Sequence, residues 1–449
     1  MLIHIAIAMC LSQCPAEFDQ ALNAPGGLSG TSVSIDGDVA VIGSPLATGT
    51  DWASGMVLVY RLIDGVWTKE AELVADDIDV GDMMGVSVDV SGNRVIAGAW
   101  FEDHAGSNSG AAYIFEISDG NWSQVAKLTA SDAGAEDAFG RRVAILGDTC
   151  IVTSPLDDDN GSSSGAAYVF QFDKTWQQTQ KLVAKDGASG DQFGLGLGMD
   201  EFHVVVGSPW AMKGAGQVHV FNRSGNIFTE TQTLTDLDGH ALDNFGFGVD
   251  VSGDWLMVGS YHDGDLGEDA GSLFVYVHTS DAGFQFHQQL YSQSDQYPDE
   301  QFGVSVAVGE SVMIIGHRFG ADNLLRTGTA SVYDFTESVW EYRTTLVPTF
   351  GTLQGEFGWS VAIDGNNAIV GAPFHEPDGY AELFVGMTSA CECIADISGD
   401  GIVGVTDLLS VIAAWGTCVS CDADLNGDGI VNVSDLLTVI SFWGNCPSF

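Results

Sequence analysis

Residues 357–373 read Phe-Gly-Trp-Ser-Val-Ala-Ile-Asp-Gly-Asn-Asn-Ala-Ile-Val-Gly-Ala-Pro, and this stretch recurs in variant form along the chain. It opens with a Phe-Gly pair, continues as an alternating apolar segment, turns at Asp-Gly, and ends a second apolar segment at Gly-Ala-Pro. Alternation interrupted by a two-residue turn is typical of a β-hairpin. The stretch therefore predicts two antiparallel strands, and its recurrence indicates a repeat protein.

Seven copies of the stretch can be aligned by the Gly that opens each one. These are Gly30, Gly85, Gly140, Gly194, Gly246, Gly303 and Gly358, at successive spacings of 55, 55, 54, 52, 57 and 55 residues. A third apolar strand follows each hairpin, and in the first six copies a fourth runs from an aromatic residue to a Leu six residues later. Four antiparallel strands repeated seven times predict an all-β fold, a seven-bladed β-propeller of four-stranded blades.

The seventh copy lacks a fourth strand, because the chain passes from residues 380–385 directly to a cysteine-rich tail. Residues 16–22 supply a spare strand, with Leu22 placed just before the first copy. Pairing the two segments would remove exposed sheet edges, so we expect the N-terminal strand to close the last blade. Cys14 and Cys391 flank these strands and are expected to approach each other.

The motifs Phe-Gly-x-Ser-Val at 357–361 and Val-Gly-Ala-Pro at 370–373 resemble the FG-GAP repeat family, the β-propeller repeats of integrin α chains and of many bacterial secreted proteins. The resemblance covers residues 28 to about 388 and implies a propeller domain over 15–388. In integrins a calcium loop lies between the first and second strands. The corresponding turns here are short, as at Asp36-Gly37-Asp38, so that calcium site does not carry over.

The charge of the chain excludes some classes of partner. The chain of 449 residues has 61 acidic and 14 basic residues, a formal net charge of -47. Nucleic acids and anionic membranes need clustered Lys and Arg, so neither is an expected partner. A hydrophobic content of 45% is too high for a disordered chain. An acidic surface of this kind favours a salty, calcium-containing extracellular medium.

Residues 2–11 form an apolar run that is too short to span a bilayer but has the length of a secretory signal core. We expect a signal peptide over residues 1–14 and a secreted or cell-surface protein; a buried N-terminal strand is the alternative. No other segment approaches a transmembrane span.

Five of the eight cysteines lie in the last 59 residues, and their positions repeat after 28 residues. The simplest pairing joins Cys393 to Cys418 and Cys421 to Cys446, in an oxidising compartment. A zinc site is the alternative for clustered cysteines. Cys150 stands in an apolar strand and is expected to be an inert buried thiol.

Two twelve-residue segments in this tail, 396–407 and 424–435, have the pattern of calcium loops, with Gly at position 6 and Asp at position 12. Two Ca²⁺ ions are therefore the expected cofactors. The expected ligands of the first loop are Asp396, Ser398, Asp400, the carbonyl of Ile402 and Asp407. Those of the second are Asp424, Asn426, Asp428, the carbonyl of Ile430 and Asp435.

Each loop leads into a short amphipathic segment, 408–415 and 436–443, and Gly follows each as a helix stop. A calcium loop followed by a helix, twice, resembles the type I dockerin, an EF-hand-like module; the resemblance covers residues 391–446. It implies that loop positions 10 and 11, which are Val405, Thr406, Val433 and Ser434, contact a cohesin-like partner. A calcium-stabilised cap without a partner is the alternative.

On the propeller, the second and fourth turns of each copy are long and acidic, and we expect a binding face there. The acidic residues are Asp76, Asp77, Asp79, Asp82, Asp157, Asp158, Asp159, Asp236, Asp238, Asp263, Asp265, Glu268 and Asp269. Aromatic residues follow the Gly-Ala-Pro position, namely Trp100, Phe101, Trp210, Tyr261, Phe319 and Phe374. They could stack on a glycan, or they could pack each turn onto its neighbour.

These observations favour a secreted, non-catalytic protein of binding or adhesion that recognises a glycan or protein ligand. The alternative is a component of polysaccharide catabolism, either a glycoside hydrolase that hydrolyses O-glycosyl bonds or its accessory subunit. Such hydrolysis needs two suitably spaced carboxylates, and the sequence nominates no pair. The histidines recur at no constant repeat position, so no catalytic residue is assigned and enzymatic activity is left open.

Overall fold

The computed structural model describes residues 16–23, 27–236, 239–293, 299–322, 325–387, 395, 397–398, 402–417, 421, 423–425, 429–441 and 444–445. The described residues from Ala16 to Met387 form one compact unit, and those from residue 395 onward belong to a second. Within these ranges, no helix is both long and apolar enough to cross a membrane.

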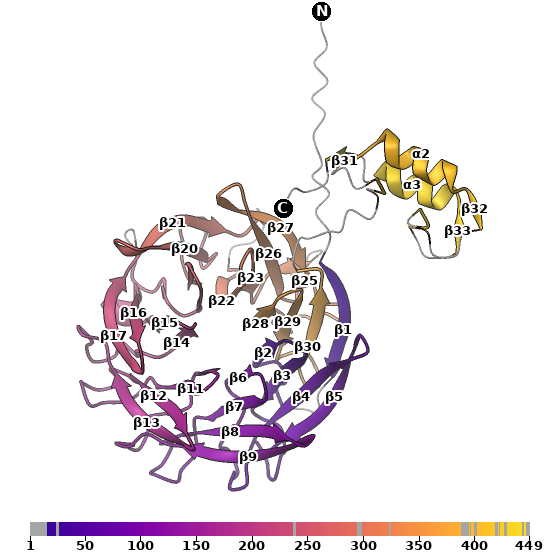
Figure 1. Cartoon of the computed structure of the whole chain (residues 1–449). Coiled ribbons are helices and arrows are strands. Elements are labelled where there is room, and N and C mark those ends of the chain that lie inside the picture. Colours follow the sequence, from indigo (N-terminus) through magenta and orange to yellow (C-terminus); the bar gives the residue numbers. More distant parts are fainter. Residues whose placement is uncertain are drawn as a thin grey trace, which may run out of the picture. The chain divides into compact units, whose positions relative to one another are not determined.

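The first unit is a ring of seven antiparallel sheets of four strands each (Figure 1), as the repeat predicts. The first strand of each blade lies nearest the centre of the ring and the fourth at the rim. Blade 1 contains β2 Ser32–Asp36, β3 Val39–Ser44, β4 Met56–Ile63 and β5 Val66–Leu73. Blade 2 contains β6 Val88–Ser91, β7 Arg94–Ala99, β8 Ala111–Ser118 and β9 Asn121–Leu128. Blade 3 contains β10 Val143–Leu146, β11 Thr149–Ser154, β12 Ala166–Asp173 and β13 Thr175–Leu182.

The remaining blades follow the same order. Blade 4 contains β14 Gly196–Met199, β15 His203–Ser208, β16 Gln217–Ser224 and β17 Ile227–Leu234. Blade 5 contains β18 Val249–Ser252, β19 Trp255–Ser260, β20 Ser272–Thr279 and β21 Gly283–Tyr291. Blade 6 contains β22 Phe302–Val308, β23 Val312–His317, β26 Thr329–Thr336 and β27 Val339–Leu346. Short additions, α1 Ala211–Gly214 and the pair β24 Ala321–Asp322 and β25 Leu325–Arg326, lie in the second turns of blades 4 and 6.

Blade 7 is completed by the N-terminal strand, which confirms the predicted closure. It contains β28 Ser360–Asp364, β29 Asn367–Ala372, β30 Tyr380–Val385 and β1 Glu17–Asn23. β1 pairs antiparallel with β30, and Leu22 stands opposite Ala381. The Leu22 side chain is 1% exposed and packs in one cluster with residues of blades 7 and 1, among them Leu383 and Ile35. The closing strand therefore ties the two ends of the ring together.

The residue pair that opens each blade, Phe-Gly in five of the seven, joins it to the blade before, as Phe139 and Gly140 illustrate. Phe139 is fully buried and forms a parallel bridge with Gly110 of the preceding blade. Gly140 has a φ of +93°, and a Cβ on it would lie 2.3 Å from the carbonyl oxygen of Ala111. Only glycine fits such a conformation so close to another backbone. The repeated pair thus marks the contact between blades.

The cores lie between neighbouring blades, where the apolar residues of facing sheets meet. One cluster combines Val57 and Val59 of blade 1 with Val95 and Tyr113 of blade 2, all of them 0% exposed. Another contains Cys150, which is a free and fully buried thiol. Burial raises the pKa of this thiol. The prediction of an inert thiol at this position agrees with that environment.

The second unit contains two copies of one loop-helix motif. Its elements are β31 Ile402–Val403, α2 Val405–Ala413, β32 Gly416–Thr417, β33 Ile430–Val431, α3 Val433–Ser441 and β34 Gly444–Asn445. β31 pairs with β34, and β32 pairs with β33, so each loop strand pairs with the strand after the other helix. Both helices begin three residues earlier than the sequence predicts, because the apolar pattern that marked them starts only after the loop.

The small core of this unit repeats with the 28-residue period of the sequence. It is formed by Ala395, Val403, Val411, Ala423, Val431 and Val439, each at most 4% exposed. Residues 28 positions apart are Ala395 and Ala423, Val403 and Val431, and Val411 and Val439. The module therefore buries equivalent residues from both copies. All three predicted disulfides have at least one cysteine outside the described residues, and they stay predictions.

Candidate functional site

The last residue of each predicted calcium loop holds that loop closed through backbone hydrogen bonds. Asp407 is fully buried, and its Oδ1 and Oδ2 accept N–H groups of Ser398 (2.9 Å) and Gly404 (2.8 Å). Asp435 is also fully buried and accepts N–H groups of Leu425 (2.9 Å) and Asn432 (2.8 Å). The two Asp residues at position 12 thus occupy equivalent places.

The environment of Asp407 favours its ionised form. Burial by itself raises the pKa of this carboxyl, but the amide hydrogen bonds from Gly404 and Ser398 outweigh burial and hold the pKa below its usual range. An ionised carboxylate is the state in which Asp can bind a cation.

Asp424, the first residue of the second loop, has one paired and one unpaired carboxylate oxygen among the described residues. Its Oδ2 accepts the N–H of Gly429 at 2.8 Å. Its Oδ1 is buried and has no hydrogen-bond partner among the described residues. A carboxylate oxygen buried without a donor is costly, and a Ca²⁺ ion would satisfy it. The residues present therefore fit calcium at this loop.

The other predicted ligands are only partly described. Ile402 and Ile430 lie in the short strands β31 and β33, and the Ile430 carbonyl accepts the Nδ2–H of Asn432 at 2.9 Å. Ser398 is exposed at the start of the first loop. Asp396, Asp400, Asn426 and Asp428 lie outside the described residues.

The residues predicted to contact a partner stand at the first turns of the two helices. Val405 and Val433 are 61% and 55% exposed, and Thr406 and Ser434 are exposed beside them. The sequence reasoning missed that each Val begins an exposed apolar stripe at helical spacing. The stripes continue with Leu409 and Ile412 on α2 and with Leu437 and Ile440 on α3, each at least 50% exposed. The i, i+4, i+7 spacing of these residues was the available signal.

On the propeller, most of the loop aromatics pack against neighbouring side chains. Trp100 stacks on Phe101 with ring centroids 4.2 Å apart, and the guanidinium of Arg141 in the next blade lies 4.9 Å from the Trp100 ring. Arg318 lies over both Phe319 and Trp359, at 4.7 Å from each ring. These contacts favour the packing interpretation over glycan stacking at these positions.

Other loop aromatics leave more surface exposed. Trp210 and Phe374 are each 42% exposed. Phe374 contacts Trp359 edge to face, with centroids 5.7 Å apart. Tyr261 packs on Phe247, with ring centroids 4.8 Å apart. Of the six predicted aromatics, Trp210 is therefore an exposed ring without an aromatic contact among the described residues.

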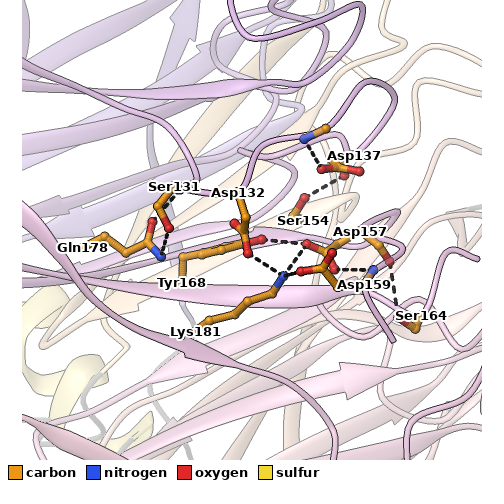
Figure 2. A network of polar contacts seen from close by, with 11 residues as sticks. Ser131, Asp132, Asp137, Ser154, Asp157, Asp159, Ser164, Tyr168, Gln178 and Lys181 are labelled. Carbon is orange, nitrogen blue, oxygen red and sulfur yellow. Dashed lines mark hydrogen bonds and ion pairs between the residues drawn. The ribbon is translucent and has the colours of Figure 1, made fainter. Parts of the chain in front are cut away.

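The acidic loop at 157–160 forms ion pairs with a lysine of the same blade, Lys181. Lys181 Nζ lies 2.9 Å from carboxylate oxygens of Asp132 and Asp157 and 2.6 Å from Asp159 (Figure 2). Tyr168 donates its hydroxyl to Asp157 at 2.6 Å. Burial by itself lowers the pKa of Lys181, but its hydrogen bonds to the three carboxylates outweigh burial and raise it. The loop is thus part of an ion-pair network.

Two inner strands carry the same sequence, Val-Asp-Val-Ser, and their Asp residues join neighbouring blades. Asp89 in β6 accepts the N–H of Ile145 in the next blade at 2.7 Å, and Asp250 in β18 accepts that of Val308 at 2.8 Å. Burial is the main cause that raises the pKa of Asp89 to about 6 and that of Asp250 to about 7. The negative charge of Asp89 also raises the pKa of Asp250.

A shallow cavity of about 330 Å³ lies between the outer strands of blades 2 and 3. Val125, Phe172 and Trp176 supply apolar lining, and Glu116 and Lys174 supply charge. The indole Nε1 of Trp176 is buried and has no hydrogen-bond partner among the described residues. The cavity borders the third turn of blade 3, so it lies away from the long acidic loops where the sequence indicated a binding face.

The family comparison agrees with the internal repeat. The model of the FG-GAP repeat matches residues 67–115, 122–170, 176–221, 228–276 and 340–382, which together make up more than half of the chain. Each match starts at the fourth strand of one blade and reaches the third strand of the next. No curated protein matches the chain. On the strength of these matches and of the seven-bladed ring, the chain belongs to the FG-GAP repeat family.

Proposed function

We propose that this is a secreted, non-catalytic binding or adhesion protein. Its propeller recognises a glycan or protein ligand. Its C-terminal module is a type I dockerin-like domain that binds two Ca²⁺ ions and attaches the chain to a cohesin-like partner. A binding role fits an FG-GAP propeller, and the more specific parts of the proposal rest on the features below.

Calcium binding is supported by the loop carboxylates. Asp407 and Asp435 are buried at equivalent positions, and the Oδ1 of Asp424 is buried without a donor. A module with so small an apolar core needs a further source of stability, which metal binding supplies in many small domains. When bound, Ca²⁺ would cross-link the loop oxygens. Asp407 and Asp435 fix the start of each helix through the N–H groups of Gly404 and Asn432.

The observation that carries the docking proposal is the pair of exposed apolar stripes. Single exposed apolar residues are ordinary, but contiguous stripes on two equivalent helices mark a surface for another protein. Val405, Leu409 and Ile412 form one stripe, and residues 28 positions later form the other. The stripes begin at the loop ends, so loop closure by calcium would also position them.

The propeller supports recognition by its rigidity and by its loops. Closing the ring with β1 leaves no blade without its fourth strand, and the ion pairs of Lys181 fix an acidic loop in place. Rigid scaffolds that present long loops commonly bind ligands through them. The exposed ring of Trp210 and the cavity beside Trp176 each offer apolar surface to a ligand.

The docking part is tested with a type I cohesin domain immobilised on a sensor. The whole protein should bind it in calcium and dissociate in EDTA. The double variant V405D and V433D should bind at least about tenfold more weakly, because two charges enter an apolar contact. V66D serves as a control, since Val66 is 57% exposed on the propeller. Absence of binding in calcium, or equal loss in the control, would contradict the proposed partner.

The recognition part is tested by probing a glycan array with the labelled whole protein and assaying each hit for release of reducing sugar. Binding without release supports the proposal, and the V405D and V433D variant should retain it. Release of sugar that follows the protein through purification would show an enzyme and overturn the non-catalytic reading.

A further inference from the structure

One position in the propeller shows a cation site repeated from blade to blade. In blade 3, Lys181 Nζ lies among the carboxylates of Asp132, Asp157 and Asp159 (Figure 2). Lys181 stands directly opposite Tyr168 in the pairing of β13 with β12. The ammonium group balances carboxylates that come from two different blades, since Asp132 follows the fourth strand of blade 2.

Blade 2 repeats this arrangement with a lysine, a tyrosine and two carboxylates. Lys127 stands opposite Tyr113 and lies 2.6 Å from Asp77 and 2.8 Å from Glu102. Asp77 lies four residues after the last Leu of β5, as Asp132 lies four residues after the last Leu of β9. Blades 2 and 3 therefore share a positive charge at this position.

Blade 4 keeps the carboxylates but lacks the lysine. His219 and Thr233 are paired where Tyr168 and Lys181 are paired in blade 3. Asp186 lies four residues after the last Leu of β13, the place that Asp132 holds one blade earlier. Glu230 of β17 adds a second carboxylate. Ligand atoms of Asp186, His219 and Glu230 all lie within 4.8 Å of one another.

The imidazole of this cluster has a buried nitrogen without a partner. His219 is 0% exposed; its Nδ1 lies 2.9 Å from Glu230 Oε1, and its Nε2 has no hydrogen-bond partner among the described residues. In blade 3 the Tyr168 hydroxyl donates to Asp157, but the loop position two residues after the proline is Ala211 in blade 4. Nδ1 is thus the imidazole nitrogen that faces the Glu230 carboxylate and would face an ion held there.

We propose that blade 4 binds a divalent transition metal ion of the Zn²⁺ type through Asp186, His219 and Glu230, at the position where blades 2 and 3 have a lysine ammonium. One imidazole and two carboxylates form a donor set that suits Zn²⁺ and related ions, whereas Ca²⁺ prefers oxygen ligands alone. Among the described residues, neither carboxylate forms an ion pair with Lys or Arg, so two negative charges face the imidazole without a counter-ion.

The surroundings allow such an ion to enter and be held. Asp186 is exposed, Glu230 is half-buried and His219 is buried, so the cluster opens to solvent on one side. Glu230 is positioned by the N–H of Lys185 at 2.9 Å and by the Thr233 hydroxyl at 3.2 Å. These contacts orient a ligating carboxylate in the way that second contacts around metal sites do. Water would complete the coordination, so the site has the open form of a reactive or exchangeable metal centre.

The test uses the whole protein in excess Ca²⁺, which saturates the C-terminal loops, titrated with Co²⁺ and Zn²⁺. Co²⁺ bound to nitrogen in low coordination absorbs strongly in the visible range, whereas hydrated Co²⁺ absorbs weakly. We expect one equivalent of metal and the strong absorption band. The variant D186N should weaken binding at least about tenfold, because loss even of an outer contact costs this much. T233K should abolish binding by placing a lysine in the site, as in blades 2 and 3.

The matched control is D132N, which changes the corresponding Asp of the Lys181 site, where the lysine is already the cation. It should leave Co²⁺ binding unchanged. Circular dichroism verifies that all variants are folded, and H219Q removes the imidazole itself. Wild-type protein without the absorption band, or a D186N variant that binds as tightly as wild type, would overturn the proposal. An equal loss in D132N would likewise show that the metal is not held in blade 4.

Discussion

Shortening Leu22 to Ala should loosen the closure of the ring. Leu22 is 1% exposed in β1 and belongs to a cluster that includes Ile35, Ile369 and Leu383 from the two joined blades. Removing a buried Leu side chain costs roughly 2–5 kcal/mol, and about 3 kcal/mol is expected for a fully enclosed site such as this one. β1 is near a chain end, so most of this loss should be expressed as local opening of the closing strand.

Hydrogen exchange of the backbone amides of β30, measured by mass spectrometry, reports this opening, because β30 pairs with β1. A loss of about 3 kcal/mol corresponds to exchange about a hundredfold faster. The matched variant is L182A, because Leu182 is 2% exposed at the equivalent place in β13. Unlike β1, β13 is connected to further strands on both sides. L182A should lower the free energy of unfolding by a similar amount without accelerating exchange in β30.

A second control is F18A, since Phe18 is 42% exposed on the same strand and should cost less than Leu22. Unchanged exchange in β30 of L22A, or equal acceleration in L182A, would refute the reasoning that β1 holds the ring closed.

Three further predictions concern charge and metal. Burial raises the pKa of Asp89 to about 6 and of Asp250 to about 7, so the folded state keeps protons that the unfolded state loses. The free energy of unfolding should therefore fall as pH rises from about 4 to about 7, and D250N should flatten this dependence in urea titrations at several pH values. Arg343 is buried with Asp334 and donates to the carbonyl of Met387 at 2.7 Å; R343M should cost roughly 3–5 kcal/mol in urea unfolding, and adding D334L should recover most of it. EDTA should abolish the circular dichroism of the C-terminal helices and leave propeller unfolding nearly unchanged, whereas unaltered helical signal would argue against calcium.

The propeller could be predicted from the sequence because its decisive contacts are repeated locally. Each Phe-Gly pair, such as Phe139-Gly140, is required by a buried bridge to the preceding blade, and this requirement imposes a visible period. The missing fourth strand of blade 7 and the spare strand ending at Leu22 were complementary for the same reason. A period in the sequence therefore determined both the number of blades and how the ring closes.

The polar networks could not be predicted, since they join residues that spacing alone does not relate. Lys181 and Asp132 are 49 positions apart and meet only because successive blades stack. Likewise, the sequence made Trp100 a candidate for sugar stacking, but Arg141 of the next blade lies over its ring. Such contacts depend on the rotation between blades, which the sequence pattern does not encode.

In the C-terminal module, the loop pattern gave the places of Asp407 and Asp435 but not the full helical surface. The exposed stripe on α2 includes Leu409 and Ile412, and the amphipathic pattern of the segment did not indicate that these residues are exposed. Among the described apolar side chains of the two helices, Val411 and Val439 are fully buried, Leu408 and Leu436 pack partly against the core, and the stripe residues are exposed. The balance between core and surface is therefore a property of module size.

The most direct test of the account is calorimetric titration of Ca²⁺ into the chelated whole protein, compared with the double variant D407N and D435N. Both carboxylates stand at position 12 of their loops and are fully buried, so both sites should weaken together. The account predicts that the wild type takes up two more Ca²⁺ ions than the variant, with helix formation measured in parallel by circular dichroism. Equal calcium uptake by the two proteins, or helices that form fully without calcium, would contradict it.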